Sequence, residues 1–128
     1  MKKVCIVTGG SSGIGLSIVK LFLTKNYQVF NLDITPSTYG DFCPCDITDV
    51  QQVNHVITQI AQQGNINVLV SNAGIHFSGS IENTSEADLE HVFNINVKGA
   101  YAAIKAVLPA MKAQRNGAII LMSSDQAL

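Results

Sequence analysis

Charged residues are scarce in this chain of 128 residues: they make up 13% of it, and the net charge at pH 7 is −1. A chain with this balance has no basic surface for nucleic acid or for an anionic membrane. Long apolar runs are missing too, since none approaches the roughly 20 residues that span a bilayer. The opening MKKVCIVTGG reaches glycine too early for a signal peptide. We therefore expect a cytoplasmic protein without nucleic-acid or membrane partners.

Cysteine is the next sparse residue, with three copies at Cys5, Cys43 and Cys45. Their odd number, and the position of Cys5 inside an apolar run, argue against a disulfide framework. The Cys43-Pro44-Cys45 pair could be a metal or redox motif, but no second ligand pair stands at zinc spacing. A short strand carrying two small side chains is the favoured interpretation. The histidines have no partner four residues away, so no metal site is predicted.

What the chain does contain is an alternation of strand-like and helix-like segments, within a composition that is 47% hydrophobic. Strands are expected at residues 3–8, 27–32, 42–45, 66–70 and 118–122, and helices at 13–25, 46–63, 85–93 and 96–112. Thr48 or Asp46 is expected to cap the second helix and Gly64 to end it. Such alternation predicts an α/β fold, a doubly wound parallel sheet with helices on both faces.

A glycine-rich turn, TGGSSGIG, joins the first strand to the first helix. Its spacing is G-x-x-x-G-x-G, and the glycines allow a tight turn through which a pyrophosphate can approach the amides of a helix N-terminus. A purely structural turn is the alternative. The cofactor-binding residues predicted here are Thr8, Gly9, Ser11, Ser12, Gly13, Ile14 and Gly15.

Asp33 follows Gly15 by 18 residues and stands at the tip of the second strand. A carboxylate at this place of a Rossmann-like sheet can accept hydrogen bonds from the adenosine ribose diol, and it repels a 2′-phosphate. The alternative is a solvated turn aspartate. No lysine or arginine lies within Gly9–Gly15, and Ile34 rather than a basic residue follows Asp33. NAD is therefore the expected cofactor, with NADP disfavoured.

Taken together, five segments in order along the chain resemble the short-chain dehydrogenase/reductase family. Three of them concern the cofactor: Thr8–Gly15 matches that family's cofactor loop, Cys45–Asp49 resembles the segment whose aspartate meets the adenine amino group, and Ser71–Gly74 resembles an Asn-Asn-Ala-Gly motif. The resemblance implies cofactor-binding roles for Asp46, Ile47, Asn72, Ala73 and Gly74. Asn72 by itself could also be an ordinary turn residue.

The other two segments concern catalysis. Asn94–Gly99 looks like the motif that carries the family's active-site asparagine, here Asn96, and Ile120–Ser124 resembles the strand that ends in a catalytic serine, here Ser124. Without the resemblance, Asn96 could equally mark a kink, a water-binding group or an ordinary polar helix face. Ser124 could simply cap a helix or turn.

By resemblance, hydride passes between the nicotinamide and a small secondary alcohol or ketone, and the serine holds the substrate oxygen. A tyrosine acts as general acid and base, and a nearby lysine lowers its pKa, because a free phenol is a poor base at neutral pH. The family's Tyr-x-x-x-Lys motif is expected after Ser124. The one such pattern here, Tyr101–Lys105, precedes Ser124 and is interpreted as a packing or subunit contact.

We therefore expect residues 1–128 to form an NAD(P)-binding Rossmann-like domain, incomplete at its C-terminus and truncated after the fifth strand. Such a fragment of a dehydrogenase would be inactive alone and would leave a sheet edge uncovered, so a homo-oligomer is expected. The alternatives are a natural remnant, or a non-catalytic dinucleotide-binding or protein-interaction module.

Overall fold

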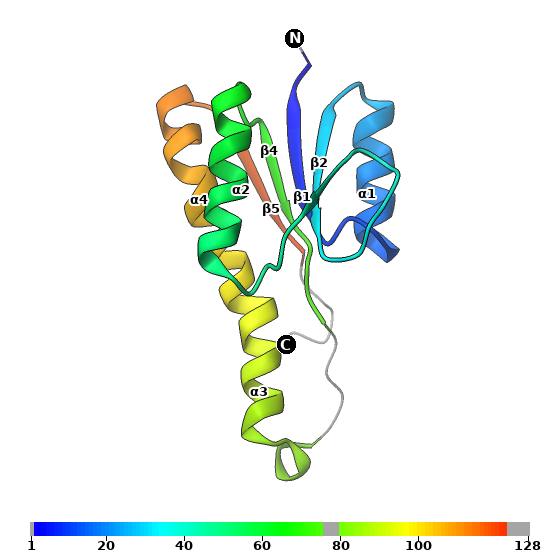
Figure 1. Ribbon diagram of the computed structural model, residues 1–128, viewed down its shortest axis with the longest axis vertical. Coiled ribbons are helices and arrows are strands. Elements are labelled where there is room, and N and C mark those ends of the chain that lie inside the picture. The colour runs from blue at the N-terminus through cyan, green and yellow to red at the C-terminus, as the bar shows by residue number, and fades with distance from the viewer. Residues whose placement is uncertain (1, 76–79, 123–128) are drawn as a thin grey trace.

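The computed structural model describes residues 2–75 and 80–122, and its core is one parallel sheet (Figure 1). The strands are β1 (Val4–Thr8), β2 (Gln28–Asp33), β3 (Asp41–Pro44), β4 (Val68–Ser71) and β5 (Ala118–Leu121). Their spatial order is β3-β2-β1-β4-β5, and every neighbouring pair is parallel. The predicted Rossmann-like sheet is confirmed. After β3 the chain crosses to the other side of β1, which makes the β1–β4 boundary the switch point of the topology.

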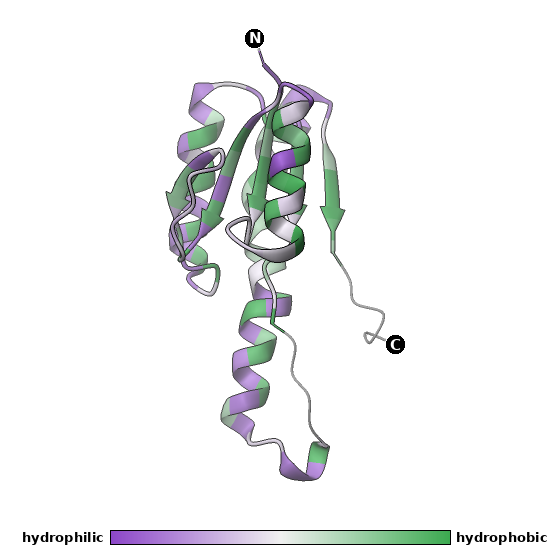
Figure 2. Cartoon of the chain, turned by 90° about the vertical axis from the view of Figure 1, so that its right-hand side faces the viewer, coloured by the Kyte–Doolittle hydropathy of each residue, from purple (hydrophilic) through white to green (hydrophobic). Residues whose placement is uncertain are grey.

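Helices cover both faces of this sheet, as Figure 1 shows. Helix α1 (Gly13–Thr24) covers one face, and α2 (Val50–Gln63) and α4 (Gly99–Gln114) cover the other. Residues of β1 alternate between two hydrophobic clusters: Ile6 joins the cluster with α2 and α4, while Cys5 and Val7 join the cluster with α1. A strand buried on both faces has to be apolar throughout, and in Figure 2 the central strands are largely hydrophobic.

Helix α2 begins later than expected. The sequence prediction placed its cap at Thr48 or Asp46, but the residue that caps it is Asp49, whose Oδ1 accepts a hydrogen bond from the Gln52 amide at 3.2 Å. The Asp46 side chain bonds to Thr48 instead: Asp46 Oδ1 accepts hydrogen bonds from the Thr48 amide and hydroxyl. Three polar residues within four positions can all cap, and only the three-dimensional turn decides among them.

Three helical segments run on from one another, and in Figure 1 the first of them lies below the sheet while the last runs up beside it. Helix α3 (Glu86–Phe93) follows the short 3₁₀ turn η1 (Ile81–Asn83) and continues through η2 (Asn94–Lys98), a π-helical turn, into α4. Asn96 lies in that π turn. A π turn inside an α-helix is an irregularity often found at functional sites, and it agrees with the kink that the asparagine suggested.

Strand β5 forms one edge of the sheet and is exposed along its whole length. Its last residue, Leu121, pairs with Ser71 of β4, so β5 ends at the same edge as β1 and β4. No helix within residues 2–75 and 80–122 has both the length and the apolar character that crossing a membrane demands.

Candidate functional site

A cavity of about 440 Å³ opens at the edge of the sheet where the strands end, next to the switch point. It brings together predicted residues from four segments of the chain: Gly9, Ser12 and Ile14; Asp33; Asp46 and Ile47; and Asn72, Ala73 and Gly74. Its remaining lining residues are Leu32, Ile34, Cys45, Thr48, Ile75 and Ile95. Residues far apart in sequence therefore meet where a sheet of this topology binds ligands.

The turn between β1 and α1 places the N-terminal end of α1 at this cavity. Gly9 adopts a φ of 71°, a conformation that favours glycine. Ser12 is the N-cap of α1, and its side chain makes no capping bond. The Leu16 amide donates to the Ser12 carbonyl at 3.1 Å and begins the helical ladder. The amides of residues 13–15 precede that ladder, and the dipole of α1 favours negative charge beside them.

Gly15 is required by close packing, not by its backbone conformation. A Cβ at this position would lie 2.1 Å from the Gly9 carbonyl oxygen and 2.4 Å from Asn72 Nδ2. The side-chain nitrogen of Asn72, Nδ2, donates to the same Gly9 carbonyl at 3.1 Å. The absence of a side chain at Gly15 therefore lets α1, the glycine turn and the segment after β4 meet.

Thr8 ties the ends of β1 and β4 together from inside the protein. Its side chain is fully buried, and its Oγ1 accepts hydrogen bonds from the Asn72 amide at 3.0 Å and from the Ala73 amide at 3.1 Å. The hydroxyl thus satisfies two backbone donors of the segment that lines the cavity. Thr8 itself does not line the cavity, so it positions the groups that do.

Replacing Thr8 with valine is expected to lower the free energy of unfolding by about 2–4 kcal/mol, because two amides would face a methyl group instead of an acceptor. Denaturant unfolding of the purified chain measures this. Thr8→Ser is the matched control: it keeps the hydroxyl and loses one methyl group, worth about 1 kcal/mol. Equal losses in the two variants would show that the hydroxyl contributes nothing.

Asp33 lies at the end of β2 with both carboxylate oxygens held by backbone amides. Its Oδ2 accepts from the Ser11 amide at 3.1 Å, and its Oδ1 accepts from the Thr35 amide at 3.1 Å. Each oxygen keeps further lone-pair capacity for an outside donor. The carboxylate is therefore fixed in direction, connected to the glycine turn, and part of the cavity wall.

Asp46 and Ile47 line the same cavity from the segment that follows β3. The hydrogen bonds from the Thr48 hydroxyl and amide hold the pKa of Asp46 below its usual range, so the group is ionised at neutral pH and can accept a bond from an amino group. Ile47 packs against the start of α4: a Cβ on Gly99 would lie 2.9 Å from Ile47 Cγ1.

Asn96 reaches the site by holding the segment that follows β4. Its Oδ1 accepts from the Ile75 amide at 2.8 Å, and its Nδ2 donates to the Ile75 carbonyl at 2.9 Å. The π turn thereby fixes the lining residue Ile75, while Asn96 does not itself line the cavity. Ser124, the other predicted catalytic residue, lies outside the described residues.

The Tyr101–Lys105 pair is separate from this cavity. Lys105 Nζ donates to the Tyr101 hydroxyl at 3.1 Å. The two residues are four positions apart, about one turn of α4. The tyrosine is 53% exposed, and neither residue lines the cavity.

The cysteines lie in environments that disfavour the thiolate. Burial raises the pKa of the Cys5 thiol to about 12, and burial together with the nearby Asp46 raises that of Cys45 to about 11. A cysteine acts as a nucleophile or as a metal ligand only when its thiol is deprotonated to the thiolate. Although Cys45 lines the cavity, its chemistry there is that of a small apolar group. Within residues 2–75 and 80–122, no three His, Cys, Asp or Glu side chains gather closely enough to hold a metal ion.

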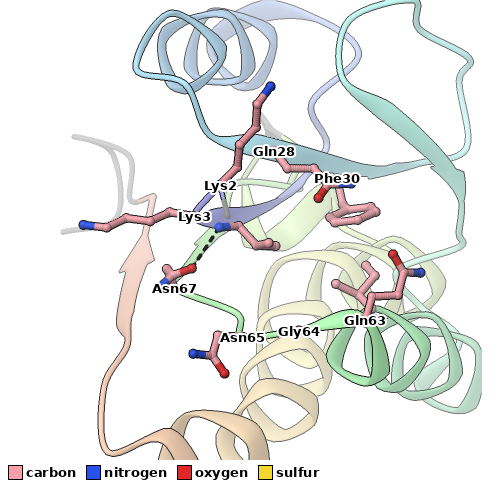
Figure 3. A pocket seen from close by; sticks show the side chains of 10 residues that line it. Lys2, Lys3, Gln28, Phe30, Gln63, Gly64, Asn65 and Asn67 are labelled. Carbon is pink, nitrogen blue, oxygen red and sulfur yellow. Dashed lines mark hydrogen bonds between the residues drawn. The ribbon is translucent and has the colours of Figure 1, made fainter.

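A second hollow, of about 560 Å³, lies at the opposite end of the sheet (Figure 3). It is lined by Lys2, Lys3, Gln28, Phe30 and other residues from the start of β1, the end of α2 and the segment before β4. In Figure 3 the ammonium groups of both lysines extend away from the space between the other side chains. Charged groups therefore do not converge there, and the cavity at the ends of the strands is the better candidate site.

Sequence reasoning missed two kinds of site residue. Ile34, Ile75 and Ile95 line the cavity from loops and from the π turn, and no local pattern marks an isoleucine as part of a binding wall. Asn31 lies fully buried in β2, directly under the glycine turn. A polar residue inside an apolar strand was the signal that could have revealed it.

Comparison with known proteins agrees with this geometry. A family model described as short chain dehydrogenase matches residues 3–128. The 3-oxoacyl-(acyl-carrier-protein) reductase FabG of Thermotoga maritima is 35% identical, and the match covers 95% of this chain and 55% of that protein. The ligand-free aldohexose dehydrogenase AldT of Thermoplasma acidophilum superposes with a TM-score of 0.94 at 38% identity, over 98% of this chain and 51% of that one.

A structure of ElxO with NADP bound superposes with a TM-score of 0.90 at 34% identity, over 97% of this chain and 56% of that one. The chain thus spans about half the length of the proteins it matches.

Proposed function

Because the chain belongs to the short-chain dehydrogenase family, we propose that residues 1–128 form the nucleotide-binding domain of an oxidoreductase that uses NAD. The reaction proposed for the whole protein is hydride transfer between the nicotinamide and a small secondary alcohol or ketone. The observation that carries the proposal is the cavity itself, in which the N-terminal end of α1, the Asp33 carboxylate and the Asn72–Gly74 segment converge.

The residues present fit a dinucleotide. The amides at the start of α1 would bind the pyrophosphate, and Gly15 would keep that helix close enough to the strand ends. Asp33 would accept hydrogen bonds from the ribose diol, and Asp46 from the adenine amino group. The bound nicotinamide would supply the hydride acceptor or donor, and this chain's residues would orient it.

Preference for NAD over NADP is part of the proposal and depends on Asp33. Its carboxylate is held toward the cavity by two amides, where a 2′-phosphate would meet like charge. ElxO, one of the similar structures, has NADP bound, so the preference of this chain has to be measured directly.

The catalytic roles of Asn96 and Ser124 are likewise proposed. Asn96 would act by holding Ile75 at the cavity wall, and Ser124 by binding the substrate oxygen. The 128 residues alone are expected to bind nucleotide without turnover, because their Tyr-x-x-x-Lys pattern, Tyr101–Lys105, does not line the cavity.

Titration of the purified chain with NAD and with NADP tests the binding proposal, followed by heat release or by a rise in Tm. The expected result is saturable binding of NAD that is tighter than that of NADP, with no nicotinamide reduction when alcohols are added. Failure to bind either nucleotide would contradict the proposal. Turnover with an alcohol would instead contradict the expectation of inactivity.

We also propose a cytoplasmic protein that associates with itself. The three cysteines are free thiols, as is usual in a reducing compartment. Apolar side chains at Leu89, Phe93, Val97 and Tyr101 are exposed along α3, η2 and α4, spaced four residues apart. Sedimentation equilibrium tests association, and a strictly monomeric chain at micromolar concentration would contradict it.

A further inference from the structure

A buried asparagine lies under the glycine turn, in a strand that is otherwise apolar where it is buried. Asn31 of β2 is fully buried, on the face of the sheet that α1 covers, and its neighbours Phe30 and Leu32 belong to the opposite cluster. Burying an amide is costly unless both of its polar atoms are bonded. An apolar side chain would fill the same space without needing hydrogen-bond partners. The hydrogen bonds of Asn31 therefore explain why this position is an asparagine.

Both of these bonds go to the glycine turn. Asn31 Oδ1 accepts from the Gly10 amide at 2.8 Å, and Asn31 Nδ2 donates to Ser11 Oγ at 2.9 Å. The fit is tight, because a Cβ on Gly10 would lie 2.6 Å from Asn31 Oδ1. Asn31 therefore fixes the turn at two successive residues, and it leaves the Gly10 amide engaged inside the protein.

From Ser11 the connection continues to Asp33. Since the Ser11 hydroxyl accepts from Asn31, its own proton is directed to the Thr35 carbonyl, to which it donates. The Ser11 and Thr35 amides in turn hold the two oxygens of Asp33. Ser11, Thr35 and Asp33 thus form a closed ring of hydrogen bonds beside the cavity, and Asn31 holds this ring from below.

We propose that Asn31 is a positioning residue for nucleotide selection: by fixing Ser11 it keeps the Asp33 carboxylate turned toward the ribose and against a 2′-phosphate. The inference rests on the proposed binding of NAD at this cavity. Asn31 does not line the cavity, so it acts through Ser11 and Asp33. Without its amide the ring would loosen, and the carboxylate could turn away from the ribose.

The test is the dissociation constant for NADP divided by that for NAD, measured by titration of the full chain carrying Asn31→Ala. The Tm of the same variant is measured in parallel. The expected ratio is about three- to tenfold smaller than in the unmodified chain, which corresponds to one or two lost hydrogen bonds. Asn67→Ala is the matched control. Asn67 Oδ1 accepts from the Val4 amide at 2.8 Å, at the far end of the sheet, so this variant should lower Tm and leave the ratio unchanged.

A second variant keeps the inference testable if Asn31→Ala does not fold. Ser11→Ala removes the hydroxyl that receives the Asn31 bond, so it should also reduce the ratio. Where Asn31→Ala does fold, combining the two substitutions should reduce the ratio little further than either one alone. An unchanged ratio in Asn31→Ala, or in Ser11→Ala where the first does not fold, overturns the inference while NAD binding stands. A chain that binds neither nucleotide, or both equally, overturns the proposed function and this inference with it.

Discussion

Gly15→Ala is expected to abolish detectable nucleotide binding and to lower the free energy of unfolding by about 3 kcal/mol or more. The added Cβ would lie 2.1 Å from the Gly9 carbonyl oxygen and 2.4 Å from Asn72 Nδ2. The first is a backbone atom of the turn, and the second is bonded to that same carbonyl. Relief therefore requires α1 to move away from the strand ends, which removes its amides from the cavity. Urea unfolding and NAD titration measure the two effects.

Gly13→Ala is the control for a change of glycine to alanine at the start of α1. A Cβ at Gly13 would meet nothing within 4 Å, but the residue has a φ of 56°. Its cost is that of a left-handed conformation, about 1–2 kcal/mol. If Gly15→Ala were no less stable than Gly13→Ala, close approach would not be the reason for glycine at position 15.

The sheet could be predicted from the sequence because its signals are local. An apolar run such as INVLV marks a strand buried in a parallel sheet, and glycine or polar residues mark its ends. The run AIILM is equally apolar, but it forms the exposed edge strand β5. The strand bounds shifted by one or two residues, as with β4 at Val68–Ser71 instead of 66–70. The wrong cap of α2 has the same origin: Asp46, Thr48 and Asp49 look alike in sequence, and their different bonds arise from the turn that they build together.

The candidate site was predictable where a short motif carries it and obscure where tertiary contacts do. The glycine turn, Asp33 and the Asn72–Gly74 segment follow strand ends, and the ends of parallel strands meet at one edge. The role of Asn31 depends on the Gly10 amide lying above it, a contact between residues 21 positions apart. Spacing alone cannot indicate such a contact, because it follows from the pairing of β1 with β2.

Asp33→Ala is expected to reduce the preference for NAD over NADP more than any other single change at the nucleotide site. Asp33 lines the cavity from the end of β2, where we propose that the ribose binds. Two unit charges 4 Å apart repel by about 1 kcal/mol in water and about 4 kcal/mol at an effective dielectric near 20. The ratio of the dissociation constant for NADP to that for NAD should therefore decrease by a factor between about 5 and about 1000. Affinity for NAD should fall as well, because the ribose diol loses its acceptor.

Asp41→Ala separates this local effect from a general loss of negative charge. Asp41 pairs with Phe30 at the start of β3, whereas Asp33 pairs with Pro44 at the other end of that strand. Both variants remove one carboxylate, so a difference between them reports position alone. Competitive titration of both nucleotides, repeated at low and high salt, measures it, and screening should weaken the preference of the unmodified chain. If Asp33→Ala kept the original ratio, or if Asp41→Ala changed it equally, Asp33 would not be the group that selects the nucleotide.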